Sequence, residues 1–192
     1  ELSGEVNLGF GSWGYQKGAF TLSGAIADNV RVLLSGSAEK SEQYDDGDGN
    51  DFVGQMDAQG IPNPNKYQDQ YKDMDAYTKK TFMAKLFWDI TENQELRLSY
   101  TANRSDDVLY PSSGMDALYD DSDIYNIEYI AKNLGTYSKE LNFQLYQSEV
   151  DHPMSTKYRN SVPMMGFEMT HSLTTEMQGA KLKNSFDLDN HT

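Results

Sequence analysis

The sequence predicts an all-β protein, an antiparallel up-and-down meander of about eight strands with its long loops at one end. Two observations carry this prediction. Apolar residues recur at every second position in eight segments, which places them on one face of a strand. After the first turn, the connections between these segments alternate between short polar turns and long loops. We therefore expect neighbouring segments to pair as hairpins.

The clearest hairpin lies in residues 80–103, where a polar break at 91–94 separates two alternating runs. The apolar positions of the two runs are Phe82, Ala84, Leu86, Trp88 and Ile90, followed by Leu96, Leu98, Tyr100 and Ala102. Since side chains alternate across a strand, these residues should share one face. Lys85, Glu95 and Arg97 should lie on the other.

Six further strands are expected, and three long loops separate them. The strands cover residues 1–10, 18–26, 30–39, 124–131, 141–146 and 180–186, and the loops cover 44–77, 105–121 and 151–178. The first of these loops is rich in Asp, Gly, Asn, Gln and Pro and has no periodicity, so we expect it to be unstructured.

The sorting of the connections distinguishes two architectures. An outer-membrane barrel has short turns at one end and long loops at the other, whereas a Greek-key sandwich has no reason to sort its loops. We therefore expect a segment of an outer-membrane β-barrel, with its apolar face toward lipid. The alternative is a soluble secreted β-sandwich that binds calcium or glycans through residues 45–57.

Composition excludes several classes of protein. A net charge of −14 argues against a nucleic-acid partner. The chain of 192 residues has no cysteine, hence no disulfide or thiolate site. No apolar run is long enough for a transmembrane helix, which leaves a barrel open. Because a strand starts at once, without a leader, we expect a piece of a longer chain.

Two stretches carry a family resemblance. Residues 11–49, GSWGYQKGAFTLSGAIADNVRVLLSGSAEKSEQYDDGDG, resemble the opening barrel strands of TonB-dependent outer-membrane receptors. Residues 77–111, YTKKTFMAKLFWDITENQELRLSYTANRSDDVLYP, resemble the next hairpin of that family, with Asp89 and Asn93 at the periplasmic turn. The likeness is distributed along the chain and has no short diagnostic signature.

The resemblance implies a location and an activity. It implies the outer membrane of a bacterial cell, a barrel of about 22 strands around a plug, and import of a scarce metal or metal chelate. Residues 1–192 would be the N-terminal part of that barrel, without the plug. The implied partners are outer-membrane lipid, a small metal ligand such as a siderophore or copper, and the TonB energy-coupling protein.

Six residues of the third loop form the first candidate site. Methionine thioethers and imidazoles are the ligands that a soft ion such as Cu(I) selects, and the loop contains His152, Met154, Met164, Met165, Met169 and His171. Together with residues 114–129 the loop resembles copper-associated TonB-dependent receptors. Methionine is also a flexible apolar filler, so packing of the loop is the alternative.

The first loop contains a second candidate site, for calcium. Asp46, Asp48 and Asn50 are spaced as the first three ligands of a calcium loop. Asp51 stands where the sharp turn needs glycine, and Asp57 stands where the last ligand is glutamate. Copper and calcium are thus the two candidate ions.

Enzymatic chemistry finds no support in the residues. The three histidines lack the spacing of a metalloprotease or of a catalytic triad, and no glycine-rich loop joins a strand to a helix. We expect no enzyme. An isolated piece of barrel has two unpaired edge strands, so we expect it to close into a small barrel or to self-associate through those edges.

Overall fold

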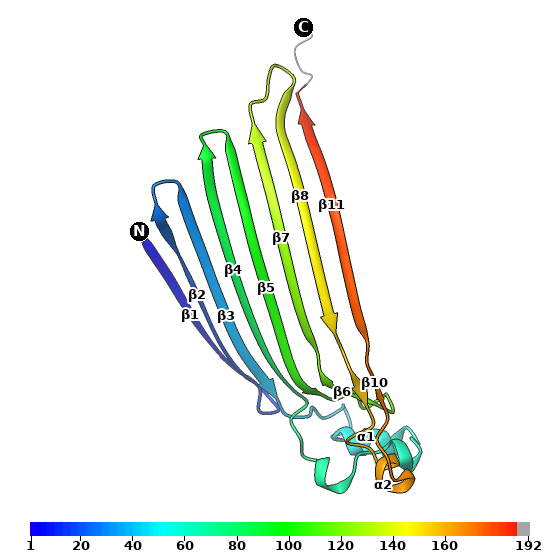
Figure 1. The fold of residues 1–192 in the computed structure, drawn as a ribbon. Helices are drawn as coiled ribbons and strands as arrows, with labels where there is room; N and C mark the ends of the chain where they lie inside the picture. Colours follow the sequence, from blue (N-terminus) through cyan, green and yellow to red (C-terminus); the bar gives the residue numbers. More distant parts are fainter. Residues whose placement is uncertain (188–192) are drawn as a thin grey trace.

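The computed structural model describes residues 1–187. Eight long strands pair in chain order, each antiparallel to the next (Figure 1). They are β1 (Leu2–Phe10), β2 (Gln16–Ala27), β3 (Val30–Ser41), β4 (Tyr77–Thr91), β5 (Gln94–Val108), β7 (Asp121–Lys132), β8 (Ser138–Asp151) and β11 (Thr174–Phe186). The predicted all-β meander is confirmed.

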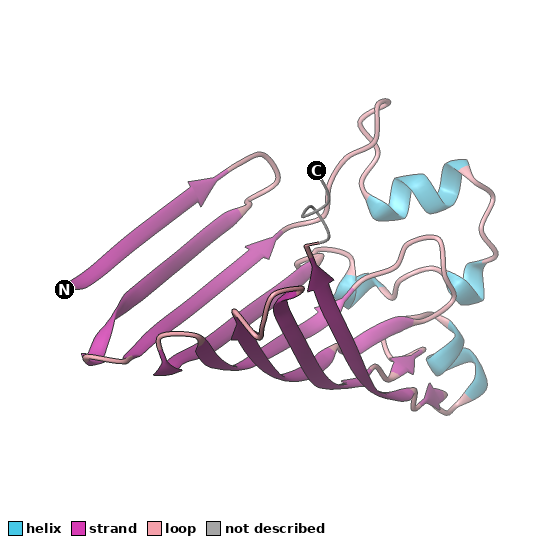
Figure 2. Ribbon diagram, turned by 90° about the horizontal axis from the view of Figure 1, so that it is seen from above, coloured by secondary structure: helices cyan, strands magenta, loops and turns pink. Residues whose placement is uncertain are grey.

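The sheet remains open. β1 pairs only with β2 and β11 only with β8 within residues 1–187, so each has one unpaired edge. Figure 2 shows that the sheet curves without bringing its two edges together. The expected closure into a small barrel is wrong for this chain, because the curvature over eight strands is too gentle. Pairing of the edges with another chain stays a prediction.

The hairpin of β4 and β5 has the predicted register. Trp88 lies opposite Leu96, and Leu86 lies opposite Leu98. Residues opposite one another point to the same side, so the face assignment is confirmed. Large apolar side chains on this face are exposed on every long strand, and they form the apolar band: Val6, Leu8, Phe20, Leu22, Leu34, Phe82, Trp88, Leu98, Ile127, Phe143, Leu145 and Leu182.

The other face carries a ladder of polar contacts. Arg31 bonds Asp89 at 3.2 Å. Arg97 bonds Glu95 at 2.9 Å and Glu128 at 3.3 Å. Charged and hydroxyl side chains thus line this face, which we call the polar face.

Two glycines let aromatic rings cross between strands. A Cβ on Gly36 would lie 2.6 Å from the Phe20 ring, and a Cβ on Gly179 would overlap the Tyr146 ring. Each glycine therefore makes room for an aromatic side chain of the neighbouring strand.

The three long loops gather at one end of the sheet, as predicted, and the short turns after β2, β4 and β7 lie at the other (Figure 1). Residues 42–76, 109–120 and 152–173 form what we call the loop unit. It contains α1 (Phe52–Ala58), η1 (Asn63–Asn65), η2 (Asp69–Tyr71), β6 (Asp116–Tyr119), β9 (Met154–Ser155), α2 (Ser161–Met165) and β10 (Thr170–His171). Since β5 extends to Val108 and β11 begins at Thr174, the second and third loops are shorter than predicted.

The expectation of an unstructured first loop is wrong. Asp51 caps α1 by accepting a hydrogen bond from the Gly54 backbone at 2.7 Å. Phe52 and Met56, one turn apart on α1, are buried. They belong to a small core with Tyr67, Ala76, Leu109 and Tyr158. Loop segments that lack periodicity can still pack when they bury side chains against one another. Within residues 1–187, no helix is long and apolar enough to span a membrane.

Candidate metal site at the loop end

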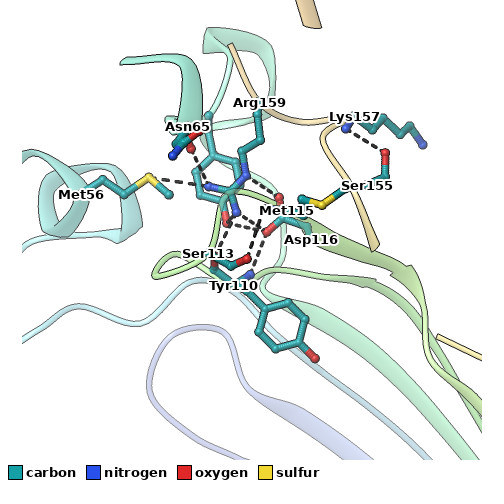
Figure 3. Close-up of polar contacts among 10 residues, drawn as sticks. Met56, Asn65, Tyr110, Ser113, Met115, Asp116, Ser155, Lys157 and Arg159 are labelled. Carbon is teal, nitrogen blue, oxygen red and sulfur yellow. Dashed lines mark hydrogen bonds and ion pairs between the residues drawn. The ribbon is translucent and has the colours of Figure 1, made fainter. Parts of the chain in front are cut away.

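A buried arginine ties the three loops together. The guanidinium of Arg159 donates to Asp116 at 2.7 and 2.5 Å, and to the carbonyl oxygens of Asn65 at 2.9 Å and Tyr110 at 3.0 Å (Figure 3). It also donates to the Tyr67 hydroxyl oxygen, at 3.1 Å. Neither Arg159 nor Asp116 is exposed. Because Arg159 lies in the third loop and its partners lie in the first and second, the pair fixes the relative positions of all three loops.

This ion pair is structural. Burial raises the pKa of the Asp116 carboxyl, and the adjacent Arg159 guanidinium opposes that shift. The carboxylate also accepts from the Tyr67 hydroxyl at 2.9 Å and from the Tyr110 backbone at 2.8 Å. Its oxygens are therefore occupied by protein donors, which leaves no place for a ligand.

The third loop folds back as a short ladder. Met154 lies opposite His171 in the pairing of β9 with β10. The same register continues on both sides: the His152 backbone donates to Leu173 at 2.8 Å, and the Thr156 backbone donates to Met169 at 3.0 Å. Alternate positions of paired strands share a face.

Four of the six predicted soft-metal residues consequently lie on one face of this ladder. We call it the Met/His face, and it comprises His152, Met154, Met169 and His171. Met169 and His171 are exposed, while His152 and Met154 are half-buried. On the opposite face Pro153 and Ser155 are buried. The two candidate ligands on and beside β10 are thus open to solvent, and the two on and beside β9 are only partly so.

His152 has an acidic neighbour. Its Nδ1 atom lies 3.6 Å from a carboxylate oxygen of Asp120, and its ring meets the edge of Tyr110 with centroids 6.3 Å apart. A carboxylate beside one imidazole nitrogen is the usual outer partner of a metal-bound histidine. This arrangement orients the ring and leaves Nε2 for a ligand.

The other two predicted residues lie on a different element. Met164 and Met165 belong to α2 and are exposed. The Met164 sulfur accepts a hydrogen bond from the Asn63 amide at 4.0 Å. The register does not bring these two methionines to the Met/His face. The soft-metal site as a whole stays a prediction.

The predicted calcium residues form a tight turn. The Asp46 carboxylate accepts hydrogen bonds from the backbone of Asp48 at 2.9 Å and from the backbone of Asn50 at 2.9 Å. The Asn50 side-chain amide adds a bond at 3.0 Å, and these contacts lower the pKa of Asp46. Within residues 1–187, no three His, Cys, Asp or Glu side chains form a group suited to a metal. Calcium binding stays a prediction.

A cavity that the sequence did not predict lies between the first and second loops. It has a volume of about 280 Å³, and its walls include Tyr44, Phe52, Gln55, Gln59 and Tyr110. The Gln55 amide nitrogen is held by the carbonyl oxygens of Tyr44 and Asn50, which leaves its oxygen as an acceptor. The one local signal was the spacing of Phe52 and Met56, which is typical of a helix face.

The fold and the loop end together define a segment of β-barrel wall, open at both edges. No protein-family model matches the chain, and no curated protein matches it. Among solved structures, the chain is similar to the copper transporter OprC, with a TM-score of 0.76 and 19% sequence identity. The match covers 99% of this chain and 26% of that one, so the chain spans about a quarter of the transporter's length. At this identity the likeness shows the fold alone.

Proposed function

We propose that this chain is part of an outer-membrane β-barrel that imports a scarce metal, in the manner of TonB-dependent receptors. The observation that carries the membrane location is the apolar band. Its side chains are exposed on one face of a single-layered sheet, and so large an apolar surface is not left in water. Lipid would cover this face, and the polar face would line the lumen.

The proposed cargo is copper, in its soft Cu(I) form. Support comes from the Met/His face, where the ladder register gathers two thioethers and two imidazoles at the loop end. Cu(I) is satisfied by few such ligands, whereas hard cations prefer oxygen. That the fold is shared with a copper transporter agrees with this choice.

The proposal also assigns the chain a place in a larger protein. Residues 1–192 would supply the first strands of the barrel, with three loops outside the cell. The plug and the segment that contacts the TonB energy-coupling protein would belong to other parts of that protein. The polar ladder of Arg31, Arg97 and Glu128 is suited to a polar occupant of the lumen.

A titration tests the cargo. The protein in detergent is titrated with Cu(I), or with Ag(I) as an air-stable substitute, and compared with the Met154→Ala, Met169→Ala and His171→Ala variants. We expect each variant to lose about tenfold in affinity, as when one partner of a metal site is removed. The control is Met177→Ala, an exposed methionine on β11. Equal affinity in all five proteins would reduce the Met/His face to packing.

The unpredicted cavity favours a second cargo, a metal chelate of the siderophore type. Its aromatic walls and its free amide oxygen suit an organic body with a few polar groups. Gln59→Trp should fill the cavity and weaken binding of a chelate without changing affinity for Cu(I). Loss of Cu(I) binding alone, in the Met/His variants, would instead favour the bare ion.

A further inference from the structure

The apolar band contains a hollow. A groove of about 510 Å³ runs over β3, β4, β5 and β7. Its floor is Ala84, and its walls include Leu34, Leu86, Leu98 and Ile127. Ala84 lies opposite Leu34 on one side and Tyr100 on the other. A small residue between large neighbours thus leaves a trough on the face that we assign to lipid.

Two stacked tyrosines close the groove on the side of the loop unit. The rings of Tyr100 and Tyr125 are 5.0 Å apart and nearly parallel. The Tyr100 hydroxyl donates to Asp123 at 2.5 Å, and Arg104 donates to the same carboxylate at 2.9 Å. Tyrosine has an apolar ring and a polar hydroxyl group, and such side chains are typical of the membrane–water interface. On β5 and β7 the apolar band therefore ends at this row, while on β4 it continues to Phe82.

A lysine lies further along β4, two residues beyond Phe82. Lys80 lies opposite Arg104 on the same face, four residues along β4 from Ala84, which corresponds to about 13 Å. Arg104 is occupied by Asp123. Lys80 is exposed and forms no ion pair within residues 1–187. A cation without a counterion thus lies on the same face as the groove, beyond Phe82 and on the side of the loop unit.

We propose that this groove binds a phosphate-bearing lipid, with an acyl chain over Ala84 and the phosphate at Lys80. The proposal rests on the proposed membrane location. The groove supplies an apolar trough for a hydrocarbon chain, and Lys80 supplies the charge complementary to the headgroup. A free phosphate would use only the lysine, and an apolar peptide would leave the lysine without a partner.

Lipid binding to the purified protein tests this assignment. Native mass spectrometry in detergent would count dioleoylphosphatidylglycerol retained by the protein, with dioleoylglycerol and glycerol phosphate as probes that lack the phosphate or the chains. Ala84→Phe should fill the groove and abolish retention of both lipids. Lys80→Gln should weaken the phospholipid about fivefold, the effect of one basic residue near an anionic headgroup, and should leave dioleoylglycerol unchanged.

Each variant has a matched control. Lys79→Gln removes the neighbouring lysine, which points to the polar face opposite Ser105. Val6→Phe enlarges an exposed residue of the apolar band outside the groove. Equal losses in the Lys79 and Lys80 variants, or undiminished retention in Ala84→Phe, would overturn the proposal. Binding of glycerol phosphate as tight as that of the phospholipid would also overturn it. The Cu(I) titration is independent, so failure here leaves the proposed cargo standing.

Discussion

The sheet and the loop unit are stabilised in opposite ways. The long strands make regular backbone ladders, yet neither face of the sheet is covered by a second layer (Figure 2). The loop unit has little regular structure but holds seven of the nine buried hydrophobic residues among those described. It also holds the buried pair of Arg159 and Asp116. Regular secondary structure and a packed core thus occur in different parts of the molecule.

This contrast indicates that the two regions depend on different solvents. Water would favour collapse or association of a sheet with an exposed apolar band, and in the proposed membrane location lipid would cover that band. The loop unit buries its own apolar side chains and can keep its shape in water.

The largest expected effect comes from breaking the buried pair. Arg159→Ala leaves the Asp116 carboxylate buried without its cation and should cost about 3–5 kcal/mol. We expect rapid proteolysis of the loop unit while the strands stay resistant in detergent, measured by mass spectrometry of the fragments. The double variant Arg159→Met with Asp116→Leu should recover much of the loss. Cleavage in the strands would contradict the separation of the two regions.

The second-largest effect is expected when a charge is placed in the apolar band. Leu98→Lys places a charge in the middle of the band and should lower the free energy of unfolding from lipid bilayers by about 2–4 kcal/mol. Thr101→Lys, on the polar face opposite Met83, is the control and should change it little. Denaturant unfolding followed by tryptophan fluorescence measures both. Similar costs for the two lysines would mean that the apolar band does not face lipid.

Crowding at a glycine gives a smaller effect within the sheet. Gly179→Ala forces the Tyr146 ring away from β11 and should cost about 1–3 kcal/mol, as overpacking does. At Gly18 an added Cβ meets only Leu8, at 3.8 Å, so Gly18→Ala should be tolerated. The same unfolding measurement separates the two variants. Equal stability of the two variants would show that the Tyr146 ring can adopt another rotamer without cost.

The smallest effect concerns pH and is confined to the loop unit. The hydrogen bonds from Asn50 and Asp48 lower the pKa of Asp46 in the folded turn. The contribution of this turn to stability is therefore complete above the ordinary pKa of aspartate, about 4, and is lost as the pH falls through the lowered folded value. The amide resonances of Asp48 and Asn50 should shift in that range. In Asp46→Asn the part of the shift that follows the lowered pKa of Asp46 should be absent.

The sequence predicted the sheet well because strand periodicity is local. The alternation from Phe82 to Trp88 determined a face and a register that the structure confirms. The same reasoning failed for the loop unit, whose stabilising contacts are not periodic. Arg159 reaches Asp116 across 43 positions and Met56 across 103. The sequence analysis did not predict α1, a helix of seven residues capped by Asp51, because its residues overlap the predicted calcium loop.

For the candidate metal site, composition identified the residues but not their arrangement. The sequence contains no pattern that distinguishes His152, Met154, Met169 and His171 from Met164 and Met165. Only the ladder between β9 and β10 makes that distinction. Likewise, the cavity beside Tyr110 depends on two loops meeting, which no single segment encodes.

The position of Arg159 also sets an order of assembly. Each hairpin of the sheet can form as soon as its second strand has been synthesised, since its contacts are between neighbours. The first loop, by contrast, contains Met56 and Asn65 but obtains their arginine partner about a hundred residues later. Until the third loop has been synthesised, the apolar residues of the first loop stay uncovered. Chaperone binding should therefore concentrate on the first loop, and should end when the third loop arrives.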